Sequence, residues 1–353
     1  MNGSGAEASV RHFRALPVLA YAAVVALVIA LGIWWRTEAL LEAWLIAFLV
    51  LAGLASASLG LLMIGHLLGE AWLHPVRGPL EAAASTAPLI VILAHPFAAG
   101  LDLLYPWAAG GVVGIAPLWS FYLNDTFVLA RGAAILLLWV ALAVPILRRG
   151  RHQTAGAVGL AILAPTAAIC PIDWVSSREP VLWSDLFAFA YTVTQLAGAM
   201  ALALLVAMSQ RSYPDPGRYH SLQRATITLA QLTFWVWFAQ FLVVWMANLP
   251  SEVEWYLVRA HGPWFGVMLA VALPALLVAI ALLLPSEPSR GRLMAAGAFL
   301  FLQYVANMLW LVRPGSAGMP VLTWVDPPVW LGLGLLWAIW YVAARRAAQA
   351  AID

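Results

Sequence analysis

Long apolar runs separated by short polar connections follow one another along the whole chain. A helix that crosses the hydrocarbon core of a bilayer needs about 20 predominantly apolar residues. Runs of that kind lie at residues 15–34, 43–66, 84–101, 126–147, 154–172, 184–208, 223–248, 263–284, 293–312 and 328–344. The pattern predicts an all-α fold, a polytopic membrane helical bundle of about ten transmembrane helices. Because the connections are only loop-sized, we expect a single integral membrane domain over residues 1–353.

Two parts of this pattern are irregular. The third run is interrupted by His95 and Pro96, and residues 110–123 after it suit a surface or re-entrant segment. The first run exceeds the roughly 7–15 apolar residues of a signal-peptide core, and no small-residue cleavage site precedes Arg36. We therefore expect the first run to remain as a membrane anchor.

The arginines divide unequally between the two sides of the predicted bundle, and all 18 basic residues are arginine. One side holds Arg11, Arg14, Arg77, Arg148, Arg149, Arg151, Arg211, Arg218, Arg224, Arg290, Arg292, Arg345 and Arg346. The other side holds Arg36, Arg178, Arg259 and Arg313, with Arg131 near a helix end. Cytoplasmic loops are enriched in positive charge. The division predicts that both termini are cytoplasmic.

Composition excludes several classes of protein. Hydrophobic residues make up 64% of the 353 residues and charged residues 10%, which excludes a soluble globular domain. The net charge of +2 comes with no basic stripe, so no nucleic-acid partner is expected. The 19 tryptophans, many near predicted helix ends, suit the headgroup region of a lipid bilayer.

The chain has a single cysteine, Cys170, at the end of an apolar run. One thiol cannot form an intrachain disulfide, a Cys-x-x-Cys-His haem attachment or an iron–sulfur site. His66 and His95 would be the pair to ligate a haem, but their expected depths differ by roughly 10 Å at 1.5 Å per residue. We expect no metal and no cofactor to be bound by this chain alone.

Two sequence blocks stand out. The first is Asp-Trp-Val-Ser-Ser-Arg-Glu-Pro at residues 173–180, followed by Trp183, Ser184 and an aromatic run. The second is an aromatic run that carries Gln240 and ends in Trp-Met-Ala-Asn-Leu-Pro-Ser-Glu at residues 245–252. An amide inside an apolar helix needs a partner, so Gln240 predicts a buried polar contact.

These blocks resemble the membrane F subunit of alternative complex III, a bacterial quinol:electron-acceptor oxidoreductase related to the NrfD/PsrC family. The family-motif residues are Trp174, Glu179, Pro180, Trp245, Asn248, Pro250 and Glu252. The resemblance implies a respiratory-chain subunit of the bacterial inner membrane that contributes quinol-side scaffold and a proton pathway. It also implies quinol as a ligand, other membrane and periplasmic subunits as partners, and haem and iron–sulfur clusters in those partners.

Polar groups inside the predicted spans are candidates for the proton pathway. His66 and Glu70 are four residues apart and so share one helix face at the cytoplasmic rim. Asp173 directly follows an apolar run at the other rim, and Gln240 lies between as a group that can hold water. The alternative for each is structural, as an ion pair at a helix end or an interhelical hydrogen bond.

Further polar residues fit the same two interpretations. Gln303 and Asn307 share a helix face, with Tyr304 adjacent, and their amides can orient a quinone carbonyl or simply pack. The periplasmic turns contain Asp173, Arg178, Glu179, Asp185, Glu252, Glu254, Arg259 and His261. These charges predict either a solvated rim with local salt bridges or a surface that collects and releases protons.

Two other functions compete with the respiratory one. A secondary transporter also uses about ten spans, but no inverted repeat or pair of broken helices is evident in the sequence. A structural or assembly protein of a respiratory complex would keep the fold without the chemistry. It is favoured by two departures from the family pattern: Val181 replaces a histidine, and residues 226–228 replace a Gly-Lys pair.

Overall fold

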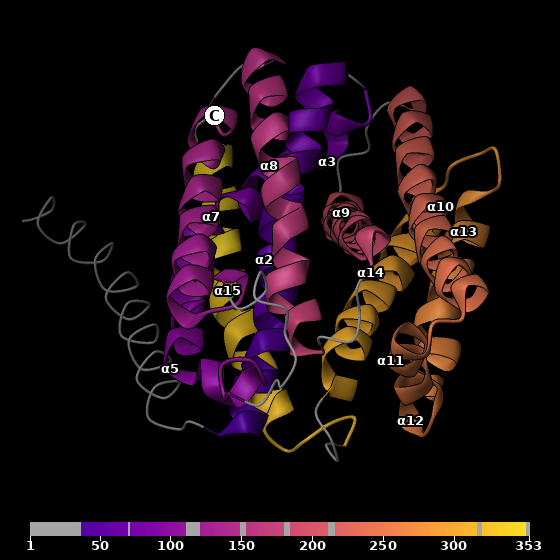
Figure 1. Ribbon diagram of the computed structural model, residues 1–353. Coiled ribbons are helices and arrows are strands. Elements are labelled where there is room, and N and C mark those ends of the chain that lie inside the picture. The colour runs from indigo at the N-terminus through magenta and orange to yellow at the C-terminus, as the bar shows by residue number, and fades with distance from the viewer. Residues whose placement is uncertain are drawn as a thin grey trace, which may run out of the picture.

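The computed structural model describes residues 37–69, 71–110, 121–148, 153–179, 184–210, 216–315 and 320–350, and within these ranges its regular structure is helical (Figure 1). The first half contains α2 (Glu38–Leu68), α3 (Leu73–Ala84), α4 (Ala87–Leu93), α5 (His95–Leu104), α7 (Asp125–Ile146), α8 (Gln153–Trp174) and η1 (Ser176–Arg178). The second half contains α9 (Asp185–Ser209), α10 (Pro216–Ala247), α11 (Pro250–Ala260), α12 (Pro263–Gly266), η2 (Val267–Ala272), α13 (Leu273–Leu283), α14 (Arg290–Val312), η3 (Arg313–Gly315) and α15 (Asp326–Ala350). The predicted all-α helical bundle is confirmed.

Nine helical segments of the described chain are long and apolar enough to cross a membrane. They are Glu38–Leu68, Leu73–Leu93, Asp125–Ile146, Gln153–Arg178, Leu186–Ser209, Gly217–Ala247, Pro263–Leu283, Arg290–Gly315 and Asp326–Ala347. Each overlaps one of the predicted spans from the second to the tenth. The predicted first span at 15–34 and most of the segment 110–123 lie outside the described residues. The chain is a multi-pass membrane protein, as predicted.

The predicted position of the third span, 84–101, is wrong. Its membrane-length part begins about ten residues earlier, at Leu73, and ends at Leu93. The prediction failed because residues 73–84 are only weakly apolar, although they form a helix whose Arg77 and Glu81 pair at 2.7 Å. Beyond Leu93, α5 is a separate helix that starts with a proline in its first turn, where the missing N–H is tolerated.

Helix α2 is the centre of the bundle. Of its most apolar stretch 89% is buried, against 28% for α7 and for α10, so α2 is shielded by other helices while those two face outward. It packs against α3, α8, α9 and α15. Thr37 caps its start by accepting the Leu40 N–H, and Gly69 ends it in the left-handed conformation at φ 69°.

Helices α9 and α14 join two sides of the bundle (Figure 1). We call α2, α3, α7, α8 and α15 the α2 side, and α10, α11, α12, η2 and α13 the α10 side. Helix α9 packs against α2 and α3 on one side and α10 on the other, and α14 packs against α9, α13 and α2. Residues on different faces of α14 therefore belong to different environments.

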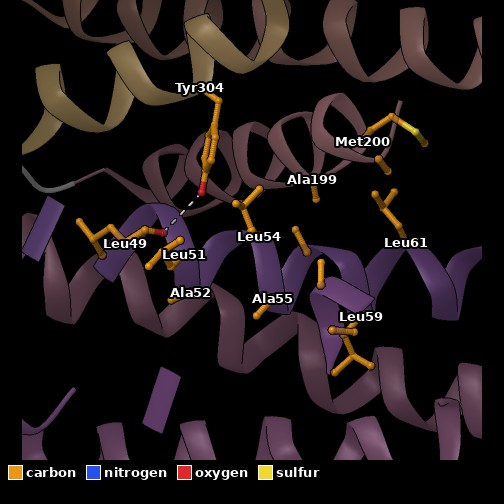
Figure 2. Close-up of a cluster of buried hydrophobic side chains, with 14 of the residues drawn as sticks. Leu49, Leu51, Ala52, Leu54, Ala55, Leu59, Leu61, Ala199, Met200 and Tyr304 are labelled. Carbon is orange, nitrogen blue, oxygen red and sulfur yellow. Dashed lines mark hydrogen bonds between the residues drawn. The ribbon is translucent and has the colours of Figure 1, made fainter. Parts of the chain in front are cut away.

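Tyr304 of α14 fixes the junction with the α2 side. Its hydroxyl donates to the Val50 carbonyl at 2.7 Å and reaches the Leu49 carbonyl at 3.5 Å, as Figure 2 shows for Leu49. The Gln195 side-chain oxygen of α9 also accepts from this hydroxyl. A Cβ on Gly53 would lie 1.4 Å from that oxygen, so glycine is required for this close approach. The Tyr304 hydroxyl thus connects α14 to both α2 and α9.

The two ends of the bundle can be defined from the helix directions. Helices α2 and α15 begin, and α8 and α14 end, at the end that lies lowest in Figure 1, near α11 and α12. We call it the ion-pair end, for the contacts described next. The opposite end holds the ends of α2, α9 and α15 and the start of α14.

Candidate ion-pair network and ligand pocket

Arg313 lies at the centre of a buried charge cluster at the ion-pair end. One guanidinium nitrogen is 3.0 Å from the carboxylate of Glu42 on α2, and another bonds Asp326 at the start of α15. All three side chains are fully shielded from solvent. Asp326 also accepts from the Thr323 hydroxyl at 2.9 Å. The cluster ties the end of α14 to the starts of α2 and α15.

Arg178 extends the cluster to α8. The tight turn η1 after α8 is held by the Ser177 hydroxyl, which donates to the Asp173 carbonyl at 2.5 Å. That turn aims Arg178 at Glu42, 2.7 Å away, with side-chain exposures of 5% and 0%. Glu42 therefore contacts two arginines that come from distant parts of the sequence.

Asp173 is bound by Arg131 of α7 through two parallel hydrogen bonds of 2.7 and 2.8 Å. The Tyr122 ring lies over the guanidinium at 3.8 Å, a cation–π contact. Burial, together with the neighbouring Asp173, raises the pKa of Tyr122 to about 12, so its hydroxyl stays neutral. Asp173 is 1% exposed, so it is enclosed by these two residues and does not lie at an open channel mouth.

Glu179 and Arg259 connect η1 to α11. The guanidinium reaches both carboxylate oxygens, at 2.9 and 2.5 Å. It also donates to the Leu311 carbonyl at 2.9 Å and stacks on Trp255 at 3.7 Å. Arg259 is 2% exposed and thus satisfies carbonyls at the end of α14 while its charge is balanced by Glu179.

The network is electrically balanced. It consists of Arg131, Arg178, Arg259, Arg313, Glu42, Asp173, Glu179 and Asp326. Four positive and four negative side chains sum to zero, so burial leaves no net charge. Removing one partner of such a buried pair is costly, about 3–5 kcal/mol, because the other charge is left uncompensated.

The two sequence blocks singled out above meet in space. Ser184, just before α9, donates to the Gln240 side-chain oxygen at 2.5 Å. Glu179 of the first block pairs with Arg259, which follows the second block by seven residues. Gln240 is 1% exposed. The buried polar contact predicted for Gln240 exists.

The second block forms the turn from α10 to α11. Asn248 adopts a left-handed conformation with φ 48°, which ends α10. Pro250 starts α11 at a position where its missing N–H is tolerated, and Glu252 in the first turn complements the helix dipole. After the turn, Arg259 of α11 reaches the carbonyls of Trp310 and Leu311 at the end of α14. Trp245 is 65% exposed, on the outer surface.

A pocket of about 410 Å³ lies on the α10 side. Its walls come from α10, α11, η2, α13 and α14, and most of them are aromatic or aliphatic. Phe238 and Phe265, 51% exposed each, stand at its outer edge, so the pocket opens sideways between α10 and α12. This is the direction that surrounding lipid would occupy.

One wall of the pocket carries buried polar atoms. Gln303, Asn307 and Trp310 of α14 line it and are 3%, 1% and 5% exposed. The side-chain oxygens of the two amides and the indole nitrogen have no hydrogen-bond partner within the described part of the chain. The spacing of four and then three residues places all three on one face of α14, as predicted for the amides.

A smaller cavity of about 190 Å³ lies on the α2 side, between α2, α8 and α9. The hydroxyls of Ser56 and Thr192 in its wall each donate to a carbonyl of their own helix. Gln195 there bonds Tyr304 and the Met308 sulfur. Its polar groups are thus satisfied by protein, and apolar cavities of this kind stay dry.

The structure does not bring the proton-pathway candidates together. His66 lies in the last turn of α2 and is 24 residues beyond Glu42, about 36 Å along the helix. Asp173 contacts Arg131 of α7, and Gln240 contacts Ser184 before α9. Glu70 lies outside the described residues. The candidates occupy three separate places, and their role stays a prediction.

Several other predicted residues can be placed. His95 packs edge-on against Trp44 near the start of α2, whereas His66 lies in the last turn of that helix. Trp44 and His66 are about 33 Å apart along α2, so the predicted depth difference of roughly 10 Å between the two histidines was too small. Trp174 packs against Phe48 and Trp139, with ring centroids 5.2 and 6.2 Å apart. Pro180 lies outside the described residues. Among those that are described, no three His, Cys, Asp or Glu side chains gather to hold a metal ion.

Glu42, Arg313 and Asp326 were not predicted as partners. The periplasmic turns were predicted to form either a solvated rim with local salt bridges or a surface that collects and releases protons; in the structure Glu42, Arg313 and Asp326 pair while fully buried between helix ends. One sequence signal was available, because Glu42, Arg313 and Asp326 each lie within two residues of a predicted span boundary on the same side. Charges that close to the hydrocarbon need partners.

No family model matches this chain, and no curated protein sequence matches it.

Proposed function

We propose that this chain is a membrane subunit of an alternative-complex-III-like quinol:electron-acceptor oxidoreductase and contributes the quinol-side scaffold. The observation that carries the proposal is the meeting of the two family-like blocks at one end of the bundle. Glu179 binds Arg259 and Ser184 binds Gln240, so residues far apart in sequence build one structure. A chance resemblance in two separate segments would not require such contacts.

The balanced network supports a scaffolding role. Eight charges, six of them buried and two partly exposed, fix the ends of α2, α8, α14 and α15 and the helix α11 in one arrangement. A rigid end of this kind suits a docking platform for periplasmic partner subunits that carry haem and iron–sulfur clusters. Electrons would then pass through the partners, while this chain holds them against the membrane.

The proposed orientation places the ion-pair end at the periplasm of a bacterial inner membrane, with both termini cytoplasmic. The arginines support it, because Arg131, Arg178, Arg259 and Arg313 at this end are each paired with a carboxylate. Paired charges add no net positive charge to a loop. Reporter fusions after Arg149, Glu254 and Arg346 are expected to report inside, outside and inside, and a periplasmic signal at Arg346 would refute this topology.

Purification from native membranes tests the function. The full chain, tagged and expressed at its natural level, is extracted in mild detergent beside an equally tagged unrelated multi-pass protein. We expect haem-containing and iron–sulfur proteins, together with quinol:acceptor activity, to accompany this chain and not the control. A chain that purifies without them, or that keeps a haem absorption band when isolated, would contradict the proposal.

A further inference from the structure

We propose that the pocket between α10 and α14 binds the ring of a lipid-soluble quinone or quinol. The choice of this ligand class over other neutral ring compounds rests on the proposed function. The existence of a ligand site does not, because it follows from the pocket wall.

The first argument is the state of the polar atoms on α14. A buried polar group without a hydrogen bond costs about 1–3 kcal/mol. Gln303, Asn307 and Trp310, which line the same wall of the pocket, each carry such an atom. On the neighbouring helix α9, by contrast, the side-chain oxygen of Gln195 accepts a hydrogen bond from Tyr304. A buried amide that serves packing is therefore paired within the bundle. We infer that a bound ligand supplies the missing hydrogen-bond partners on α14.

The second argument concerns charge and hydrogen-bonding type. Arg259 is the charged residue that lines the pocket, and Glu179 neutralises it through two contacts. A fatty-acid carboxylate or a phospholipid headgroup would find no free counter-charge there. Amides present both donors and acceptors, whereas an indole N–H donates. A wall of this composition can bond the carbonyls of a quinone and equally the hydroxyls of a quinol.

The third argument is shape. A volume of about 410 Å³ falls within the range of roughly 300–1,000 Å³ that small-molecule pockets occupy. Phe234, Trp237, Phe238 and Phe241 of α10 also line it and offer faces for an aromatic ring. The sideways opening beside Phe265 lets a long apolar tail remain in the lipid.

The backbone of the α13 wall is specialised in the same place. Residues Val267–Ala272 form a π-helix, and Met268, Leu269 and Ala272 of this stretch line the pocket. A π segment widens a helix locally and occurs frequently at functional sites. Pro274 follows at the start of α13, where its missing N–H removes one backbone hydrogen bond and favours the altered register.

The test measures ligand binding and ligand-free stability together. The purified full chain is titrated with a short-tail benzoquinone and a short-tail naphthoquinone, and the midpoint of thermal unfolding is recorded with and without each. We expect at least one analogue to raise the midpoint of the natural chain. In the double variant Gln303→Leu with Asn307→Leu, we expect affinity for that analogue to fall at least tenfold.

The ligand-free stability separates a binding role from a structural one. Because the two amide oxygens are unpaired, the double variant is expected to unfold at or above the temperature of the natural chain. A variant that is markedly less stable would mean that the amides serve packing, and the inference would be wrong. It would also be wrong if neither analogue binds the natural chain, or if the variant binds as tightly.

A matched control is Gln195→Leu, which removes a bonded buried glutamine outside the pocket and should leave the affinity unchanged. The outcome is independent of the purification experiment. A chain that binds the analogue but has no redox partners overturns the proposed function alone. A chain with those partners that binds neither analogue overturns the pocket assignment alone.

Discussion

Gln195 and Gln303 are both buried glutamines of membrane-length helices, 4% and 3% exposed, but their surroundings differ. The Gln195 oxygen accepts from Tyr304 at the junction with α2, whereas the Gln303 oxygen has no partner in the described chain and belongs to a residue that lines a pocket. On the α2 side, the polar groups of the cavity bond to protein. On the α10 side, polar groups line an open cavity. The difference separates polar residues that hold the bundle together from polar residues that are available to a ligand.

The charge network belongs to the first kind, and its loss should have the largest effect. Arg313→Met leaves Glu42 and Asp326 buried without their shared partner, and we expect a loss of about 3–5 kcal/mol in the free energy of unfolding. Arg290→Met is the control. Arg290 is partly exposed and donates to the Met208 carbonyl at 2.6 Å, so its loss should cost about 1 kcal/mol or less. Denaturation in detergent compares the two.

Equal losses in the two arginine variants would mean that the ion-pair end is no more constrained than the opposite end. The scaffolding argument would then lose its energetic basis.

Asp173→Asn should have a smaller effect of the same kind. It leaves Arg131 without its carboxylate, but that guanidinium is 11% exposed and can gain some water, so we expect about 1–3 kcal/mol. The double variant Asp173→Asn with Arg131→Gln should recover part of the loss. Membrane abundance and quinol turnover are measured side by side. Normal abundance with lowered turnover or proton release would instead favour the proton pathway.

The two glutamines provide the next comparison. Gln195→Leu removes one acceptor of the Tyr304 hydroxyl, which keeps the Val50 carbonyl, and we expect a loss of about 0.5–1.5 kcal/mol. Gln303→Leu removes an unpaired oxygen and should leave the stability unchanged or slightly raised. Both variants replace glutamine by leucine, and the two glutamines are buried to a similar extent. If both destabilise the chain equally in thermal unfolding, the two sides do not differ as described.

The smallest effect on stability is expected from filling the pocket. Ala260→Leu enlarges an exposed side chain that lines the pocket and should change the stability by about 1 kcal/mol or less, while it abolishes the quinone-dependent shift. Ala279→Leu is the control because Ala279 is 0% exposed in the packed contact between α13, α9 and α14. Overpacking there should cost about 1–3 kcal/mol and leave the quinone-dependent shift intact.

Hydropathy alone predicted most of the fold, because a membrane-length apolar run can be recognised from its own residues, without knowledge of its tertiary contacts. It failed between residues 73 and 101, where a weakly apolar segment is held in a helix by Arg77, Glu81 and tertiary packing. A window of hydropathy does not register such contacts. The left-handed Asn248 and the following proline, by contrast, were visible as a turn in the sequence.

The candidate site was less predictable. The shared face of Gln303 and Asn307 follows from helix periodicity, and a partner for Gln240 follows from the cost of burial. Whether an amide faces a cavity or another helix depends on the packing of distant segments, here α10 and η2 against α14. For the same reason Glu42 could not be assigned to Arg178 and Arg313, which are more than 130 residues away.

The central claim, that the ligand site lies on the α10 side near the ion-pair end, can be tested by mapping a photoreactive quinone on the chain in its native membranes. After illumination, labelled peptides are identified by mass spectrometry, with excess unlabelled quinone as competitor. We predict competed labelling within residues 234–241, 256–276 or 303–310. Competed labelling confined to the α2 side, or confined to other proteins of the membrane, would contradict the claim.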